Sequence, residues 1–204
     1  MATMKTPAYY DAVPSIVMVD PLAQMLGSAE EGLLEYRYID AVKLTGHSCP
    51  TVAGAWLMTH AALAQLYPGG TPRRGDIRVE LRQPLEEGVT GVVASVAALV
   101  TGAANAGGFK GLAGQFGRKD LLQFGVPMDG DIRFTRTDTA KSVAWVRRGF
   151  PAPRSAALAQ LMRDALAPGA PEDARRAFAS AWSAWVAQVL QPGGESEWAA
   201  VAAR

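Results

Sequence analysis

Residues 44–70 read LTGHSCPTVAGAWLMTHAALAQLYPGG. This stretch carries both histidines of the chain and its only cysteine, which is followed directly by Pro50. Proline suits the first position of a helix, because the N–H group that it lacks would have no partner there. Apolar residues then recur at helical spacing until the PGG that ends the segment. The pattern predicts a helix of about five turns from Pro50, with Cys49 at its N-cap.

The predicted position of Cys49 favours chemistry at its sulfur. An N-cap sulfur faces free backbone N–H groups and the positive end of the helix dipole, and both favour the thiolate. His47 lies two residues earlier on a predicted extended segment, so both side chains can share one side. Such a pair suits either a soft metal site or a Cys/His nucleophile pair. The alternative is that Cys49 packs as a small buried hydrophobe. His60 lies about 15 Å further along the predicted helix, too far to join the pair.

The flanking segments predict an α+β fold. Hydrophobic and polar residues alternate over 33–39 and 77–82, which is typical of half-buried strands, and 132–146 predicts a hairpin. The uncharged stretch at 89–102 predicts a helix buried on all sides. We therefore expect an antiparallel or mixed sheet packed against this helix and the helix from Pro50, rather than a doubly wound parallel sheet.

The composition changes near GFPAPRS, which predicts a core domain at 1–150 and a C-terminal helical extension at 151–204. Two helices are expected in the extension, at 155–167 and 171–191, divided by PGAP. The second carries Trp182 and Trp185 in an apolar stripe. We interpret this stripe as a packing face, within the chain or across a homodimer.

Composition excludes several classes of protein. The chain has 204 residues, 49% of them hydrophobic, and a net charge of +1 without a basic block, so no nucleic-acid partner is expected. One cysteine rules out an internal disulfide framework and a four-cysteine zinc module. The N-terminal segment lacks a signal-peptide pattern, which predicts a cytoplasmic protein. The strongly apolar part of the uncharged stretch, Val92 to Val100, is about half the length of a membrane helix, so no membrane contact is expected.

Three further residues are candidates for a site. Lys110 lies in a glycine-rich loop that could cradle a phosphate or an acidic substrate, although it matches neither nucleotide-binding fingerprint. The alternative is that the glycines allow close backbone packing. Glu80 alternates with Arg78 and Arg82 and is either part of a solvated ladder or a third metal ligand or base. Asp138, at the expected hairpin tip, is a turn residue or a ligand.

The GHSCP segment resembles the signature of formylmethanofuran dehydrogenase E-subunit-like proteins, in which Gly-His-x-Cys-Pro opens a helix. LVTG at 99–102 and RFTRTDTAKSV at 133–143 fit the same family in order, and the latter resembles its Arg-x-Asp-Thr-Gly-Lys hairpin. The resemblance covers roughly residues 15 to 150. It implies an α+β homodimer that holds a transition metal such as zinc at His47 and Cys49, with Asp138 and Lys141 matching the hairpin pattern.

The chain departs from that family at two points. Val92 and Ser95 stand where many members have a cysteine and an aspartate, and the C-terminal cysteine-rich zinc finger is replaced by tryptophan-bearing helices. We expect a small metal-binding protein or metalloenzyme that acts on a small-molecule ligand. The alternatives are a non-catalytic accessory protein that carries a metal or cofactor, and cysteine-based catalysis without metal.

Overall fold

The structure is a computed structural model that describes residues 4–149, 155–191 and 198–201. Its helices and strands are β1 (Ile16–Val19), α1 (Pro21–Met25), β2 (Leu33–Tyr36), α2 (Tyr38–Thr45), α3 (Pro50–Leu66), β3 (Ile77–Leu81), α4 (Thr90–Thr101), β4 (Leu122–Gln123), β5 (Ile132–Arg136), β6 (Ser142–Arg147), α5 (Ala156–Leu166), α6 (Glu172–Leu190) and β7 (Trp198–Ala200). Short 3-10 helices span Ala8–Ala12 and Glu30–Gly32. The predicted α+β fold is confirmed.

The main sheet is mixed. Its strand order is β4-β3-β5-β6-β7, in which β3 and β4 are parallel and the other neighbours antiparallel. Val79 faces Phe134, and Ile132 faces Trp145, so these apolar side chains share one face of the sheet. β1 and β2 form a separate antiparallel pair. The alternation at 77–82 and 132–146 thus predicted these strands correctly.

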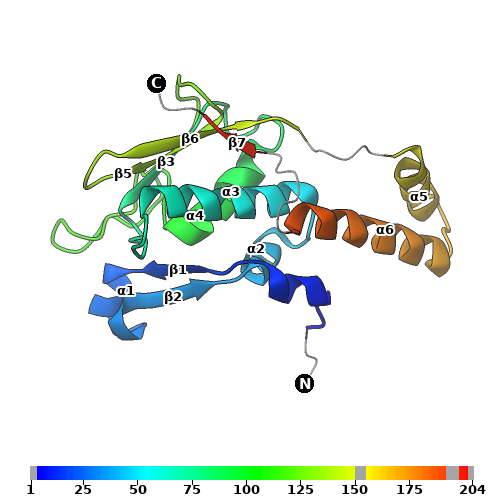
Figure 1. The fold of residues 1–204 in the computed structure, drawn as a ribbon, viewed down its shortest axis with the longest axis horizontal. Helices are drawn as coiled ribbons and strands as arrows, with labels where there is room; N and C mark the ends of the chain where they lie inside the picture. Colours follow the sequence, from blue (N-terminus) through cyan, green and yellow to red (C-terminus); the bar gives the residue numbers. More distant parts are fainter. Residues whose placement is uncertain (1–3, 150–154, 192–197, 202–204) are drawn as a thin grey trace.

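Helices α3 and α4 lie between the main sheet and the β1–β2 pair (Figure 1). This middle position explains why α3 is buried along most of its length, including Trp56 and Met58. A helix that is apolar nearly all round needs partners on more than one side. The layering leaves the N-terminus of α3 close to α2 and α6, where the candidate site lies.

The predicted strand at 33–39 is only partly correct. β2 ends at Tyr36, and the chain turns into helix α2, so a helix rather than an extended segment precedes His47. The N–H of Arg37 donates to Asp40 Oδ2 at 2.9 Å, which stabilises the first turn. Tyr38, Ala41 and Val42 are buried at helical spacing. That periodicity outweighs the short alternation that predicted a strand.

Helix α4 matches the helix expected at 89–102, but it is not buried on all sides. Val93, Val96 and Val100 are buried, whereas Ser95 is exposed and Val92 half-buried. The helix therefore has one face in the core and one near the surface. None of the helices in the described ranges combines the length and apolar character that a membrane crossing requires.

The two C-terminal helices form as expected, and α5 with the beginning of α6 projects from the body (Figure 1). The end of α6 is different, since Val186, Val189 and Leu190 belong to the hydrophobic core. Strand β7, which was not predicted, pairs with β6 and extends the main sheet. The end of α6 thus packs with the core, and the division between a core and an extension stays a prediction. The predicted boundary at GFPAPRS lies largely outside the described residues.

Candidate functional site

Cys49 is the N-cap of α3, as the sequence predicts. Its Sγ accepts a hydrogen bond from Val52 N at 3.5 Å, and Pro50 occupies the first turn. Gly46 ends α2 in the left-handed conformation with φ 74°, and its N–H bonds to Val42 O at 2.9 Å. Helix α2 therefore stops and α3 starts within four residues, which fixes the backbone of the His47–Cys49 segment.

The imidazole of His47 is oriented by the chain just before it. Nδ1 lies 2.9 Å from the carbonyl oxygen of Thr45. Because a carbonyl can only accept, Nδ1 carries the proton in this arrangement, and Nε2 of the neutral ring remains an acceptor. Thr45 Oγ1 in turn lies 2.9 Å from the carbonyl oxygen of His47. The exposed imidazole thus presents Nε2 as a base or ligand.

Ser48, between the two candidates, is held from two sides. Its Oγ shares a hydrogen bond of 2.8 Å with the hydroxyl of Tyr38, and its carbonyl oxygen accepts from Trp182 Nε1 at 2.9 Å. Tyr38 also meets Tyr10 edge to face, with ring centroids 5.0 Å apart. Burial raises the pKa of Tyr38, so its hydroxyl stays protonated at neutral pH. These contacts tie the segment to α2 and α6.

His47 and Cys49 both line a pocket of about 390 Å³, which we call the Cys49 pocket. One wall comes from the start of α3 and the residues before it, and the other from α5 and α6. The lining residues are His47, Cys49, Pro50, Thr51, Leu158, Ala159, Met162, Phe178, Trp182 and Trp185. Cys49 is half-buried, so its sulfur is neither sealed in the core nor freely exposed.

The aromatic stripe of α6 forms part of this pocket. Trp182 meets Trp185 edge to face at 5.3 Å between ring centroids, and Phe178 lies 5.6 Å from Trp182. Sequence reasoning interpreted the stripe as a packing face and did not connect it with Cys49. The signal was the helical spacing of the three aromatic residues, but nothing in it indicated that the stripe would face residues 47–51. The homodimer expected from the stripe stays a prediction.

Glu80 lies outside the Cys49 pocket, on β3. It is 4% exposed, and Arg133 donates to both carboxylate oxygens at 2.9 and 2.8 Å. The hydrogen bond from Arg133 holds the pKa of Glu80 below its usual range against the opposing effect of burial, and the charge of Arg78 adds to this. Glu80 is therefore buried and bound by arginines, and is not part of the solvent-exposed row of charges that the sequence pattern suggested.

Asp138 lies at the tip of the β5–β6 hairpin. Arg136 binds both of its carboxylate oxygens, at 2.9 and 2.6 Å, and this hydrogen bonding lowers the pKa of Asp138 to about 2. Arg136 also donates to the carbonyl oxygen of Leu66, and Lys141 to that of Gln65, so the hairpin tip caps the C-terminus of α3. Cys49 is at the other end of this helix, about 25 Å away along its axis.

The glycine-rich loop packs closely on itself. A Cβ on Gly111 would meet Gln115 O at 2.3 Å, and one on Gly108 would lie 2.9 Å from the backbone of Lys119. Lys110 is exposed on this loop. Gly108 and Gly111 are thus required for close backbone approach, which favours the structural alternative over a phosphate cradle.

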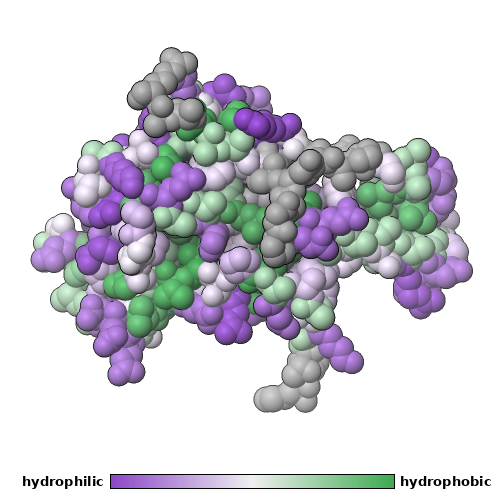
Figure 2. Space-filling model, viewed as in Figure 1, coloured by the Kyte–Doolittle hydropathy of each residue, from purple (hydrophilic) through white to green (hydrophobic). Residues whose placement is uncertain are grey.

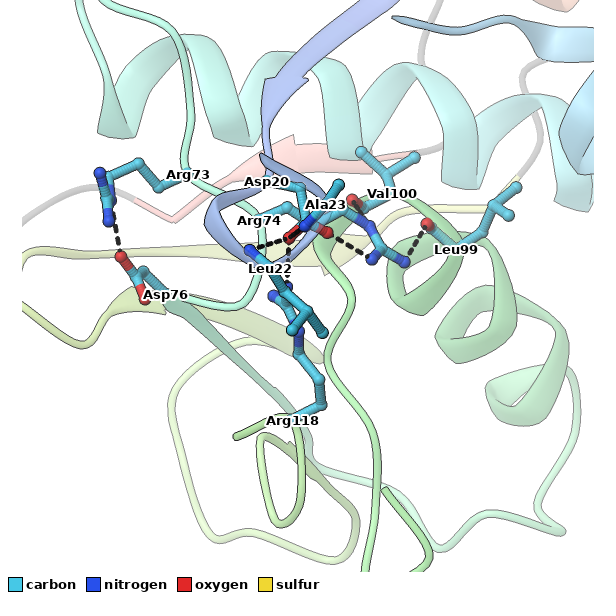
Figure 3. Close-up of polar contacts among 9 residues, drawn as sticks. All are labelled: Asp20, Leu22, Ala23, Arg73, Arg74, Asp76, Leu99, Val100 and Arg118. Carbon is cyan, nitrogen blue, oxygen red and sulfur yellow. Dashed lines mark hydrogen bonds and ion pairs between the residues drawn. The ribbon is translucent and has the colours of Figure 1, made fainter. Parts of the chain in front are cut away.

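Sequence reasoning missed a buried ionic cluster around Asp20 (Figure 3). Asp20 Oδ2 lies 2.9 Å from Arg74 Nη1 and Oδ1 2.7 Å from Arg118 Nη2, while the carboxylate also caps α1. Arg74 donates further to the carbonyl oxygens at the end of α4. A Cβ on Gly75, which has φ 90°, would meet the Arg118 guanidinium at 1.4 Å, so another residue there would strain the backbone and displace Arg118. The cluster joins segments far apart in sequence, which no local pattern reveals.

The described residues do not complete a metal site around His47 and Cys49. Throughout 4–149, 155–191 and 198–201, no three His, Cys, Asp or Glu side chains lie together so as to hold a metal ion. A structural zinc site takes about four protein ligands, and this segment supplies two. The described residues alone therefore do not form a closed zinc site at His47 and Cys49.

Comparison of the chain with protein-family models, with curated proteins and with solved structures gave no match. The resemblance to formylmethanofuran dehydrogenase E-subunit-like proteins therefore stays a prediction that rests on the GHSCP segment and the later pieces.

Proposed function

We propose that this chain binds a small, largely apolar molecule in the Cys49 pocket, with Cys49 and His47 at the polar end of the ligand. The observation that carries the proposal is the lining of one pocket by a half-buried thiol, an imidazole and three aromatic side chains. Its volume of about 390 Å³ falls within the range of pockets for small ligands, which are mostly apolar with a few convergent polar groups.

The polar end of the pocket suits an electron-poor group of the ligand, such as a carbonyl. Cys49 is the N-cap of α3 and lines the pocket, so its sulfur, the nucleophilic atom of cysteine, borders the space for a ligand. His47 Nε2 can accept a proton or a hydrogen bond, because Nδ1 is occupied by Thr45 O. The same groups serve a carrier that holds its ligand by contact and an enzyme that forms a transient bond to sulfur.

Binding of N-phenyl-1-naphthylamine, an apolar fluorescent probe, tests this proposal. Ala159 lines the pocket, so Ala159→Phe should fill it and abolish the fluorescence increase that the wild type gives. Ala177→Phe is the matched control, because Ala177 is exposed on α6 outside the lining residues. Equal binding by wild type and Ala159→Phe would contradict the proposal.

A second candidate function is transition-metal binding at His47 and Cys49, with zinc as the expected metal. The observation in its favour is the Thr45–His47 hydrogen bond, since metal-binding histidines usually donate their other ring N–H in this way. The remaining ligands would come from solvent, from the bound molecule or from a second copy of the chain. Metal analysis of protein purified without a histidine tag, compared with Cys49→Ser, tests it. An equal and negligible metal content in both proteins would exclude this candidate.

A further inference from the structure

The two walls of the Cys49 pocket differ in how firmly they are held. His47, Cys49, Pro50 and Thr51 belong to the body of the molecule, where the start of α3 is buried. The opposite wall includes Leu158, Ala159 and Met162 of α5. Helix α5 therefore faces Cys49 across open volume, and access to the pocket depends on what holds α5.

Helix α5 has few buried side chains, and its packing is mainly against α6. Ala165 is its only buried residue in the described chain, while Met162 is 41% and Leu166 74% exposed. Figure 2 shows apolar surface over α5 and the beginning of α6, which project from the body of the molecule. On its other side α5 borders a second hollow of about 420 Å³, which shares Leu158 and Trp185 with the Cys49 pocket. An element with so little buried apolar surface opens at low free-energy cost.

Helix α6 is anchored much more firmly. Trp185, Val186, Val189 and Leu190 are buried at its C-terminal end. One turn earlier, Trp182 donates to Ser48 O at 2.9 Å, and Ser183 Oγ shares a hydrogen bond of 3.1 Å with Tyr9. The two helices are joined at 167–171, where Gly169 has φ 73°. This short turn is a suitable hinge, because a few residues between helices can absorb a change in backbone angles.

We propose that α5 is a cover over the Cys49 pocket, which swings on the 167–171 turn to admit a ligand while α6 stays fixed as the back wall. The inference rests on the proposed function, because a cover serves a pocket that takes a ligand. A ligand between Cys49 and the apolar face of α5 would add contacts that the empty pocket lacks, so binding favours the closed position.

The test uses the wild-type chain without any ligand, so its outcome is separate from that of the probe titration. The labelling rate of Cys49 by a bulky aromatic disulfide, divided by the rate in urea-unfolded protein, gives an opening constant. Amide hydrogen exchange gives opening constants for α5 and for α3, because a helix of 11 residues that leaves its packing is only marginally stable in water and its amides then exchange. The proposal predicts that the Cys49 and α5 constants agree and exceed the α3 constant by at least about a hundredfold, as expected for local opening.

Two results would overturn the proposal. If Cys49 labels as fast as in unfolded protein, nothing covers it; if its opening constant equals that of α3, only global unfolding exposes it.

A matched pair of variants adds a second check. Leu158→Ala, which removes a contact of α5 with the core, should raise both the labelling rate and the α5 exchange rate about tenfold. Leu166→Ala, on the same helix but 74% exposed, should change neither. Equal effects of the two substitutions would also contradict the proposal.

Discussion

Trp182 Nε1 donates a hydrogen bond to the carbonyl oxygen of Ser48 at 2.9 Å, across 134 positions of sequence. The acceptor lies between His47 and Cys49, and the indole ring of the donor lines the pocket that these residues share. One side chain therefore both fixes the segment and forms the apolar wall beside it. Trp182 thus has two roles, as a hydrogen-bond donor and as a pocket wall, and substitutions can measure each role separately.

Trp182→Phe keeps an aromatic ring and removes the N–H donor. We expect a loss of about 1 kcal/mol in the free energy of unfolding, the usual contribution of one neutral hydrogen bond, with little change in affinity for N-phenyl-1-naphthylamine. Trp182→Ala removes the wall as well and should weaken probe binding about tenfold. Urea unfolding and fluorescence titration measure the two effects. A larger loss of affinity in Trp182→Phe than in Trp182→Ala would show that the two roles are assigned wrongly.

The end of α6 should behave as part of the core. Leu190 is 5% exposed, so Leu190→Ala should lower the free energy of unfolding by about 3 kcal/mol through lost burial and the cavity left behind. Leu166→Ala makes the same change at an exposed position of α5 and should stay within about 0.5 kcal/mol of wild type. Similar values for both variants, measured by urea unfolding, would show that the end of α6 is not part of the core.

Asp20 should make stability depend on pH. Burial acts to raise the pKa of Asp20, but hydrogen bonds from Arg74 and the Ala23 N–H, together with the charge of Arg118, hold it below its ordinary value. A carboxylate with a lowered folded-state pKa stabilises the fold above its unfolded pKa of about 3.9 and loses that contribution as the pH falls through the folded value.

Asp20→Asn should therefore lower the free energy of unfolding by about 3 kcal/mol at pH 7, with a shrinking difference from wild type as the pH falls below about 4. Urea unfolding over this pH range measures it. Glu35→Gln, which removes an exposed ion pair with Arg37, is the control and should have far less effect at pH 7. A destabilisation by Asp20→Asn that persists unchanged at low pH would contradict the electrostatic account.

Asp138 and Glu80 should have no part in chemistry at Cys49. Both are engaged by arginines away from the pocket, Asp138 at the opposite end of α3 and Glu80 on β3. Asp138→Asn and Glu80→Gln should therefore leave the Cys49 labelling rate, any metal content and probe affinity at wild-type values, even where stability falls. Loss of bound metal in either folded variant would restore these residues as ligands.

Much of the fold could be predicted because its determinants are local. Proline after Cys49 and the apolar spacing beyond it specify α3, and alternation over 77–82 and 132–146 specifies central strands of the sheet. The strand predicted from alternation over 33–39 failed at 37–39, where Asp40 and the burial of Tyr38 and Val42 favour a helix. A segment of four or five residues can fit both the two-residue period of a strand and the 3.6-residue period of a helix. Burial in the tertiary structure then decides which of the two forms.

Only one wall of the Cys49 pocket, the start of α3 with the residues before it, could be predicted from the sequence. The N-cap position of Cys49 follows from Pro50, but the opposite wall depends on how α6 packs against α3. Trp182 reaches Ser48 only because the end of α6 is drawn into the core by Val186 and Val189. The ionic cluster around Asp20 is equally non-local, since it joins Asp20, Arg74 and Arg118 from separate loops. Long-range packing of this kind leaves no periodic signal in a single sequence.

In the proposed function, Cys49 forms the polar end of a pocket that takes a small apolar molecule. Alkylation of Cys49 by iodoacetamide, followed by mass spectrometry with and without saturating N-phenyl-1-naphthylamine, tests it most directly. A ligand in the pocket must lie against the sulfur, so we expect the bound probe to slow alkylation about tenfold or more, and alkylated protein to lose probe binding. An unchanged alkylation rate with the probe bound, or undiminished binding to alkylated protein, would show that the ligand does not lie against Cys49.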